Sequence, residues 1–211
     1  MAKEILRRAV SVTELLNKKH KTLPFTGRWL NSFGEPELTG TWLIWGNSGS
    51  GKTRFALQLA KYLAQFTRVA YDSLEEGASA SLKQAIQETG MIEVKRRFIV
   101  LDKEPIPELI KRLEQHKSPQ VVFIDSVQYS GLNYTTYRNL IEQFRNKLFV
   151  LVSHADGKHP AGRVAKSIRF DAMVKIYVEG YRVPAPASRY GGGDPFTIWP
   201  EGATEYWGFI D

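Results

Sequence analysis

Short apolar runs alternate with segments of helical periodicity through the middle of this chain. Runs rich in Val, Ile, Leu and Phe predict buried strands at 41–45, 68–73, 98–102, 121–125 and 148–153. Apolar residues at helical spacing predict helices between these strands, at 53–66, 78–89, 106–115 and 134–146. Strands that alternate with helices are typical of a parallel sheet with helices on both faces, so we expect an α/β fold.

The pattern changes before the first strand. Residues 11–20 predict a short helix that begins at Ser11 or Thr13 and turns Val12, Leu15 and Leu16 inward. Pro and Gly interrupt the next stretch, which predicts a linker. We therefore expect an N-terminal helix and linker over 1–37 and one core domain over 38–211.

The pattern changes again after Asp171. Short strand-like runs occur at 173–179, 181–186 and 196–199, and Gly191-Gly192-Gly193 separates the last two. Strands this short, broken by glycines, favour antiparallel pairing. We expect them to form a C-terminal antiparallel extension of the same sheet.

Composition narrows the functional classes. The chain has 211 residues and no cysteine, which excludes disulfides, thiolate nucleophiles and zinc ribbons. No apolar run is long enough to span a bilayer, and residues 1–21 lack the apolar core of a signal peptide, so we expect a soluble cytoplasmic protein without a membrane partner. The net charge of +7 favours a polyanionic partner such as nucleic acid.

One motif carries most of the functional information. The segment between the first strand and the first core helix fits the phosphate-loop pattern G-x-x-x-x-G-K-[ST] in full. Backbone amides of such a loop, with the helix that follows, cradle phosphates; here Lys52 reaches the β- and γ-phosphates and Thr53 binds Mg²⁺. The sequence thus predicts ATP and Mg²⁺ as cofactors, held by Gly46, Asn47, Ser48, Gly49, Ser50, Gly51, Lys52 and Thr53.

Carboxylates at the ends of two further strands complete a predicted ATPase site. Asp125 ends an apolar run and is expected beside Mg²⁺. Glu75 and Glu76 follow the second strand, where a carboxylate can activate water opposite Lys52. The alternative for this acid pair is a solvated turn that caps the next helix, which suits Glu76 best.

The order of GNSGSGKT, YDSLEE, VVFIDSVQ and LFVLVSHADG resembles the ATPase core of RecA, the bacterial RadA protein, KaiC and DnaB-type helicases. The resemblance covers roughly residues 38 to 192, is strongest by motif with RadA, and implies a RecA-like P-loop NTPase fold. It implies that Glu75 is the catalytic glutamate and that His154 senses the γ-phosphate and relays its presence to a DNA-contacting loop; a structural histidine is the alternative. It also implies a ring or filament with ATP between neighbouring subunits.

Ser188-Arg189-Tyr190-Gly191 resembles the Lys-Asn-Arg-Phe-Gly element of RadA, in which basic side chains reach a neighbour's nucleotide. Arg189 is the expected arginine finger. The lysine position of that element is Ala187 here, so a second cation is missing. The alternative is that Arg189 only flanks the glycine turn.

The resemblance also implies two single-stranded DNA loops, at 128–134 and 155–169. Flexible backbone with basic side chains suits phosphate contacts, and tyrosines can stack on bases. The expected DNA contacts are Tyr129, Tyr134, Lys158, Arg163, Lys166 and Arg169. The alternative is a surface helix over 164–170 with an exposed basic face, and tyrosines that fill core gaps.

Three functions fit these residues. The first is a DNA-stimulated ATPase of recombination, annealing or repair, similar to short core-only RecA-like ATPases of phages and mobile elements. The second is a KaiC-like ATPase that regulates a protein partner without DNA. The third is a small-molecule kinase, against which stand the Glu75-Glu76 pair and the lack of an Arg-rich lid. Leu23-Pro24-Phe25 either docks on a neighbouring subunit or covers its own core.

Overall fold

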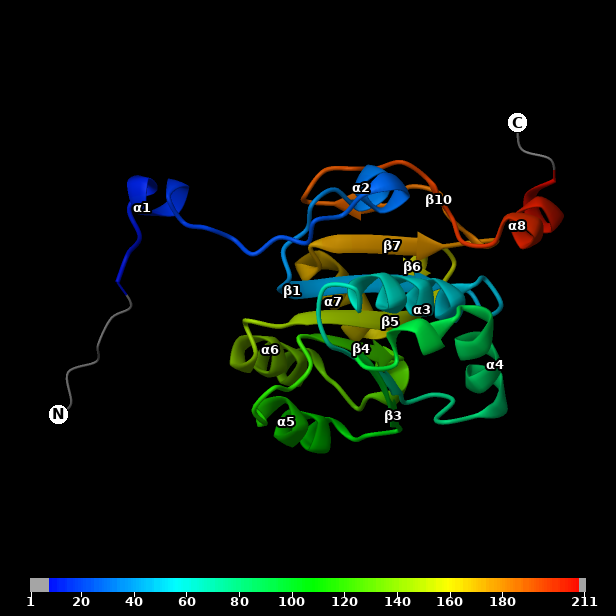
Figure 1. Ribbon diagram of the computed structural model, residues 1–211, viewed down its shortest axis with the longest axis horizontal. Coiled ribbons are helices and arrows are strands. Elements are labelled where there is room, and N and C mark those ends of the chain that lie inside the picture. Colours follow the sequence, from blue (N-terminus) through cyan, green and yellow to red (C-terminus); the bar gives the residue numbers. More distant parts are fainter. Residues whose placement is uncertain (1–7, 209–211) are drawn as a thin grey trace.

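Within residues 8–208, which the computed structural model describes, six parallel strands form the centre of the molecule. They are β1 (Gly40–Gly46), β2 (Val69–Ser73), β3 (Phe98–Asp102), β4 (Val121–Asp125), β5 (Leu148–Asp156) and β7 (Val174–Val178). Their order in the sheet is β3-β2-β4-β5-β1-β7, so β1 lies between β5 and β7 (Figure 1). The expected α/β fold with a largely parallel sheet is confirmed.

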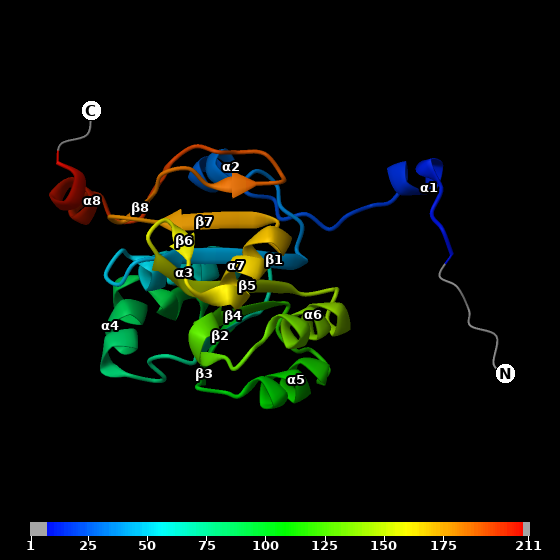
Figure 2. The same cartoon turned by 180° about the vertical axis from the view of Figure 1, so that it is seen from behind.

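Helices cover both faces of this sheet. One face carries α2 (Gly27–Phe33), α3 (Lys52–Leu63), α4 (Ala80–Glu88) and the short 3₁₀ helix η1 (Met91–Val94). The other carries α5 (Ile106–Glu114), α6 (Tyr134–Gln143), α7 (Gly162–Asp171) and the 3₁₀ helix η2 (Val127–Tyr129). Figure 1 shows α3 in front of the sheet, and Figure 2, from behind, shows α7 in front. Alternate side chains of β1 enter the two cores: Trp42 and Ile44 one, Leu43 and Trp45 the other.

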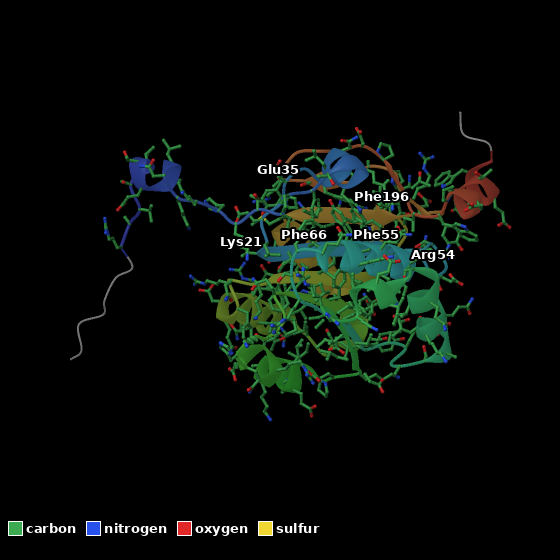
Figure 3. All side chains as sticks on the ribbon, in the orientation of Figure 1. Lys21, Glu35, Arg54, Phe55, Phe66 and Phe196 are labelled. Carbon is green, nitrogen blue, oxygen red and sulfur yellow. The ribbon has the colours of Figure 1, made fainter. Side chains whose placement is uncertain are left out.

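The segment expected to be a linker contains a helix that completes one core. Trp29 and Phe33 of α2 are buried against Phe55 of α3, and Leu23 and Phe25 are buried beside them. The rings of Phe55 and Phe196 lie 5.4 Å apart and point toward each other in this layer (Figure 3). Leu23 and Phe25 therefore cover their own core, the second of the two alternatives weighed for them.

The first helix, α1 (Val12–Leu16), stands away from the body (Figures 1 and 2). Ser11, the first of the two caps expected from the sequence, caps it and forms a capping box with Glu14. The expectation that its apolar side chains turn inward is wrong, because Val12, Leu15 and Leu16 are all exposed.

The C-terminal strands pair differently from the expectation. The run at 173–179 forms β7, which is parallel to β1 and so belongs to the central sheet. The antiparallel extension consists of β9 (Ala187–Ser188) on β7 and β6 (His159–Pro160) on β5. The short strands β8 (Arg182–Val183) and β10 (Phe196–Thr197) pair separately, and α8 (Pro200–Trp207) follows them. Over the whole described range, 8–208, no helix is long and apolar enough to cross a membrane.

Candidate functional site

The predicted phosphate loop joins β1 to α3 at the carboxyl end of the sheet. Gly46 leaves β1 so close to its neighbour β7 that a Cβ there would overlap the carbonyl oxygen of Val178. Gly51 has a φ of 99° at the start of α3, and the ring of Tyr181 packs against it. The amide of Tyr181 donates to Ser50 O at 3.0 Å. Tyr181 thereby supports the loop, within which the amide of Ser50 donates to Asn47 O at 3.2 Å.

A cavity of about 350 Å³ lies in front of this loop. It brings together the predicted phosphate, metal and catalytic groups from four strand ends, although they are far apart in the sequence. Its lining includes Lys52, Thr53, Glu75, Asp125 and His154. The geometry is that expected at the carboxyl edge of an open α/β sheet.

Lys52 is held inside this cavity. Its Nζ donates to Asn47 O at 2.8 Å. Partial burial lowers the pKa of Lys52, while Asp125 and Glu75 oppose that shift. The hydroxyl of Ser50 is buried and has no hydrogen-bond partner among the described residues. A cation at the phosphate loop, inside the cavity, suits a bound phosphate.

Asp125, at the end of β4, shares the cavity with Thr53. Its Oδ2 accepts a hydrogen bond from the hydroxyl of Tyr71, a residue of β2. Burial raises the pKa of Asp125 to about 6, and the hydrogen bond from Tyr71 and the charge of Lys52 act in the opposite direction. An additional positive charge beside Asp125 would therefore lower the pKa of this carboxyl and favour its ionised form.

Mg²⁺ fits this donor set only together with a nucleotide. Among residues 8–208, no group of three or more His, Cys, Asp or Glu side chains is arranged to hold a metal ion. Mg²⁺ is commonly held by one or two protein ligands plus water and substrate phosphates. Thr53 and Asp125 provide such a minimal set beside the phosphate loop.

Glu75 and His154 form the main polar contact across the cavity. Nε2 of His154 lies 2.9 Å from Oε2 of Glu75. The same carboxylate oxygen accepts from the hydroxyl of Ser126 at 3.1 Å, and the amide of Glu75 donates to Asp125 O at 3.1 Å. Three strand ends thus fix the position of this carboxylate. It is half-buried and free to contact a ligand in the cavity.

Glu76 behaves differently from its neighbour. It is exposed and accepts hydrogen bonds from Ser81 Oγ at 2.7 Å and Ser79 Oγ at 3.3 Å. Ser79 is also the N-cap of α4. This is the helix-capping arrangement considered for the acid pair, and it leaves Glu75 as the acid turned toward the other catalytic candidates.

Gln128 connects the two segments that follow β4 and β5. Its Nε2 donates to Ser153 Oγ at 2.9 Å and to Ala161 O at 3.0 Å. Its Oε1 accepts from the amide of His154 at 3.2 Å. Three hydrogen bonds therefore tie the segment after β4 to the strand that carries His154.

Sequence reasoning did not assign roles to Tyr71, Ser126 and Gln128. Tyr71 lies in an ordinary apolar strand run, and its hydroxyl becomes relevant only because β2 pairs with β4. Ser126 directly follows Asp125, so the acid at the end of this strand indicated that the next residues lie near the site. Gln128 lies in the segment 128–134 that was predicted to contact DNA.

Arg189 lies far from the cavity of its own chain. It directly follows β9, and its amide donates to Met173 O at 3.1 Å, at the amino end of β7. The phosphate loop borders the opposite end, where Gly46 pairs with Val178. Five residues of strand separate the two ends by roughly 13 Å. The Arg189 side chain therefore does not reach the phosphate loop of its own chain.

The segment 155–169, expected to be a flexible loop, is instead a tight hairpin followed by a helix. Asp156 pairs with His159, and α7 then runs from Gly162 to Asp171. The expectation of an open loop is corrected because Ala165 and Ile168 bury one face of this helix in the core. The structure has the surface helix that was the alternative.

Some of the basic side chains predicted to contact DNA are exposed, and one packs against the protein itself. Lys158, Arg163 and Lys166 are exposed, and Nζ of Lys166 lies 3.6 Å from Asp156 Oδ2. Arg169 instead lies over the Trp45 ring at 5.4 Å. Phe170, which follows it, is 78% exposed.

The two predicted DNA-contacting tyrosines do not fill the core. Tyr129 and Tyr134 remain 55% and 41% exposed, and the hydroxyl of Tyr134 donates to Asp171 at 3.0 Å. Cations and exposed aromatic rings thus lie on the same side of the molecule, around η2, α6 and α7. Whether they bind nucleic acid stays a prediction.

No protein-family model and no curated protein matches the chain. Among solved structures, a KaiC-like protein from the hyperthermophilic archaeon Pyrococcus horikoshii OT3 is similar, with a TM-score of 0.51 and 19% sequence identity. The similarity covers 67% of this chain and 71% of that one. At this identity the similarity shows the fold alone, the α/β fold that this chain shares with that KaiC-like protein.

Proposed function

We propose that this chain binds Mg·ATP at the phosphate loop and hydrolyses it, and that it acts on single-stranded DNA in recombination, annealing or repair. The contact between Glu75 and His154 carries the proposal, because it unites a candidate base with a candidate sensor in one cavity with Lys52, Thr53 and Asp125. The RecA-like fold supports it.

In the proposed reaction each side chain has a distinct task. Lys52 and the loop amides bind the β- and γ-phosphates. Thr53 and Asp125 would hold Mg²⁺, which would reduce the negative charge of the phosphates. Glu75 orients a water molecule and takes up its proton. His154 positions the Glu75 carboxylate through the contact at 2.9 Å.

The path from the cavity to a DNA surface is short. His154 lies in β5, and its amide is bound by Gln128, which belongs to the segment before the exposed Tyr129. After β5 and the hairpin comes α7, with Arg163 and Lys166 exposed. A change at the γ-phosphate therefore has direct structural routes to both segments proposed to contact DNA.

Assembly is part of this proposal. Arg189 lies at the amino end of β7, opposite the phosphate loop. A ring or filament in which the amino edge of one copy meets the nucleotide of the next would let this guanidinium stabilise transition-state charge. Hydrolysis would then depend on assembly.

The test is ATP hydrolysis with and without single-stranded DNA, at low and high salt. We expect DNA to raise the rate several-fold and salt to remove that effect, because phosphate contacts release counterions. The double variant Arg163→Gln, Lys166→Gln should lose the stimulation and keep the basal rate. Arg96→Gln with Lys111→Gln, two exposed cations elsewhere, is the matched control.

A KaiC-like ATPase that regulates a protein partner is the second candidate. The folded hairpin and helix over 156–171 are compatible with it, since a regular surface suits a protein partner as well as a strand of DNA. A wild-type protein that hydrolyses ATP but neither binds nor responds to DNA would support this candidate and contradict the first.

A further inference from the structure

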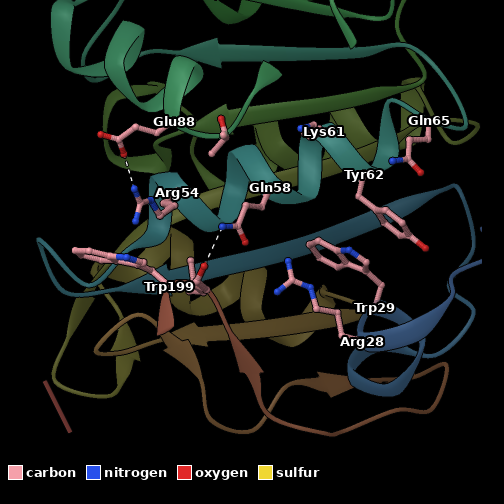
Figure 4. A pocket seen from close by; sticks show the side chains of 11 residues that line it. Arg28, Trp29, Arg54, Gln58, Lys61, Tyr62, Gln65, Glu88 and Trp199 are labelled. Atoms are coloured by element: carbon pink, nitrogen blue, oxygen red, sulfur yellow. Dashed lines mark hydrogen bonds and ion pairs between the residues drawn. The ribbon is translucent and has the colours of Figure 1, made fainter. Parts of the chain in front are cut away.

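A second cavity, of about 460 Å³, lies on the outer face of α3 and takes no part in the proposed reaction (Figure 4). Helix α3 provides one wall, α2 another, the end of α4 a third, and residues 198–199 close it. Four side chains along one face of α3 line it, and Gln65 follows just after the helix: Arg54, Gln58, Lys61, Tyr62 and Gln65. It shares no lining residue with the phosphate-loop cavity.

Cations outnumber carboxylates in this second cavity. Arg28, Arg54 and Lys61 line it, and Glu88 is the one carboxylate in the described lining. Glu88 pairs with Arg54, and Lys61 pairs with Glu93 at 2.9 Å. Those two cations are therefore largely neutralised.

Arg28 is the cation without a carboxylate partner among the described residues. Its Nη1 donates to the carbonyl oxygen of Thr197 at 3.3 Å, and its guanidinium lies 4.4 Å from the centroid of the Phe196 ring. Partial burial lowers its pKa, and an arginine remains charged at neutral pH all the same. A fixed, uncompensated guanidinium is a strong binding group for phosphate.

Planar groups line the rest of the cavity. The rings of Trp29 and Tyr62 stack at 4.9 Å with an angle of 9° between them. At the other end the guanidinium of Arg54 lies 4.7 Å above the Trp199 ring. A flat guanidinium backed by an aromatic ring offers its free face to another planar group.

Gln58 adds an unused acceptor between these two ends. Its Nε2 donates to Ile198 O at 3.0 Å (Figure 4). Its Oε1 is buried and has no hydrogen-bond partner among the described residues. A buried acceptor without a donor is costly, so rotation of this amide toward a ligand N–H group would be favourable.

From these three features we infer that the second cavity binds a nucleoside phosphate. The base stacks on the planar groups, and a base amine donates to Gln58. The volume is in the range of small-ligand pockets. Two sources can supply the ligand. The first is a separate nucleotide, whose phosphate meets Arg28. The second is the nucleotide at the phosphate loop, since Arg54 directly follows Thr53; its base and sugar, and not its phosphate, would then meet Arg28. The second source rests on the proposed function.

Titration calorimetry with AMP, Mg·ATP and Mg·triphosphate tests the inference. Arg28→Gln should weaken AMP or ATP binding about 10-fold to 100-fold, the range for loss of a hydrogen bond to a charged group. Gln58→Leu is the second variant, which leaves the charge intact. Arg96→Gln, an exposed arginine elsewhere, is the matched control, and thermal unfolding checks that all variants are folded.

Lys52→Ala separates the two sources. A separate nucleotide would bind as AMP with unchanged affinity in Lys52→Ala, and this binding would weaken in Arg28→Gln. A base from the phosphate-loop nucleotide would instead make Arg28→Gln weaken ATP binding while triphosphate binding stays as in the wild type.

The inference is overturned if folded Arg28→Gln and Gln58→Leu match Arg96→Gln with every probe. Its failure is distinct from that of the proposed function. Wild-type protein that hydrolyses ATP without any effect of these variants contradicts only the second cavity. AMP binding that depends on Arg28, in a protein without ATP hydrolysis, contradicts only the proposed function.

Discussion

Nε2 of His154 lies 2.9 Å from Oε2 of Glu75, although 79 residues separate them in the chain. The contact exists because β2 and β5 both flank β4 and end at the same edge of the sheet. It fixes the carboxylate that the proposed reaction needs. Substitutions of these two residues test it.

Replacing Glu75 by Gln should separate binding from turnover. The amide keeps the size and the contacts of the side chain but cannot accept a proton from water. We expect kcat to fall by about 10²-fold to 10⁴-fold, with ATP affinity within a few-fold of the wild type. Hydrolysis assays and calorimetry check this, with Glu76→Gln as the matched control. An unchanged rate in Glu75→Gln would exclude this residue as the base.

His154 should act through Glu75 and not on the phosphate alone. Without the imidazole the carboxylate keeps only the hydroxyl of Ser126 as a side-chain partner. We therefore expect His154→Ala to lower kcat by on the order of 10²-fold with little change in KM.

The double variant His154→Ala, Glu75→Gln provides the control for that coupling. It should be no slower than Glu75→Gln alone, since both changes remove one function. Independent, multiplicative losses would show that the two side chains do not work as a unit.

Arg189 should be required by a neighbouring copy. Its position at the amino end of β7 excludes its own nucleotide site. We expect Arg189→Ala to lose roughly 10³-fold or more in kcat, as for other arginine fingers. Mixing it with Lys52→Ala should recover part of the rate, because each variant supplies what the other lacks.

One outcome of the mixing experiment would contradict this role of Arg189. Two inactive proteins that stay inactive when mixed, although they co-assemble in sedimentation, would show that Arg189 only flanks its glycine turn.

How far the fold follows from the sequence differs between elements. The strands at 98–102 and 121–125 match their predicted bounds, because a run of apolar residues ends at a polar one in each. Helix α2 was missed, since Gly27 begins it and its N-cap Thr26 makes no side-chain capping bond. Tertiary contacts, among them the burial of Trp29 and Phe33, stabilise it.

The candidate site shows the same division. The phosphate loop is a local pattern, so its place between β1 and α3 could be predicted. The hydrogen bonds of Glu75 with His154 and Ser126 depend on strand order, which a single sequence does not specify. The exposure of Leu15 and Leu16 could not be predicted either, because an amphipathic pattern does not identify what covers the apolar face.

Phe25 should be a stability residue and Leu16 should not. Phe25 is 2% exposed, and its ring contacts Tyr62 and Trp42 at 5.0 and 6.2 Å. We expect Phe25→Ala to lower the free energy of unfolding by about 3–5 kcal/mol. Leu16→Ala, at a side chain 80% exposed, should change it by less than about 0.5 kcal/mol. Denaturant unfolding of both variants checks the contrast, and a small loss in Phe25→Ala would contradict the packing of this segment.

Asp72 should make the protein less stable as the pH rises. The side chain is fully buried; Oδ1 accepts from the amide of Glu104 at 3.1 Å, and Oδ2 has no partner among the described residues. Burial raises its pKa from 3.8 to about 7. The folded state therefore keeps a proton that the unfolded state releases, and this contribution is complete below about pH 4 and lost as the pH rises to about 7.

Asp72→Asn should remove that dependence. Across this range the wild type should lose up to about 1.4 kcal/mol of unfolding free energy per pH unit more than the variant. Denaturant unfolding at pH 5 and pH 8 measures it, with the exposed Asp156→Asn as control. Equal slopes in the wild type and Asp72→Asn would contradict a buried, protonated carboxyl.

Gly46 and His154 occupy the same rung of the sheet, as directly paired residues of β1 and β5. Backbone hydrogen bonds, and not side-chain packing, thus set the spacing between the first residue of the phosphate loop and the histidine, at about 4.8 Å between strands. This spacing is already fixed within a single subunit. If neighbouring subunits activate the protein, they do so by adding charge to a site whose geometry is already set. A single chain should therefore bind nucleotide in the same geometry as the assembled protein.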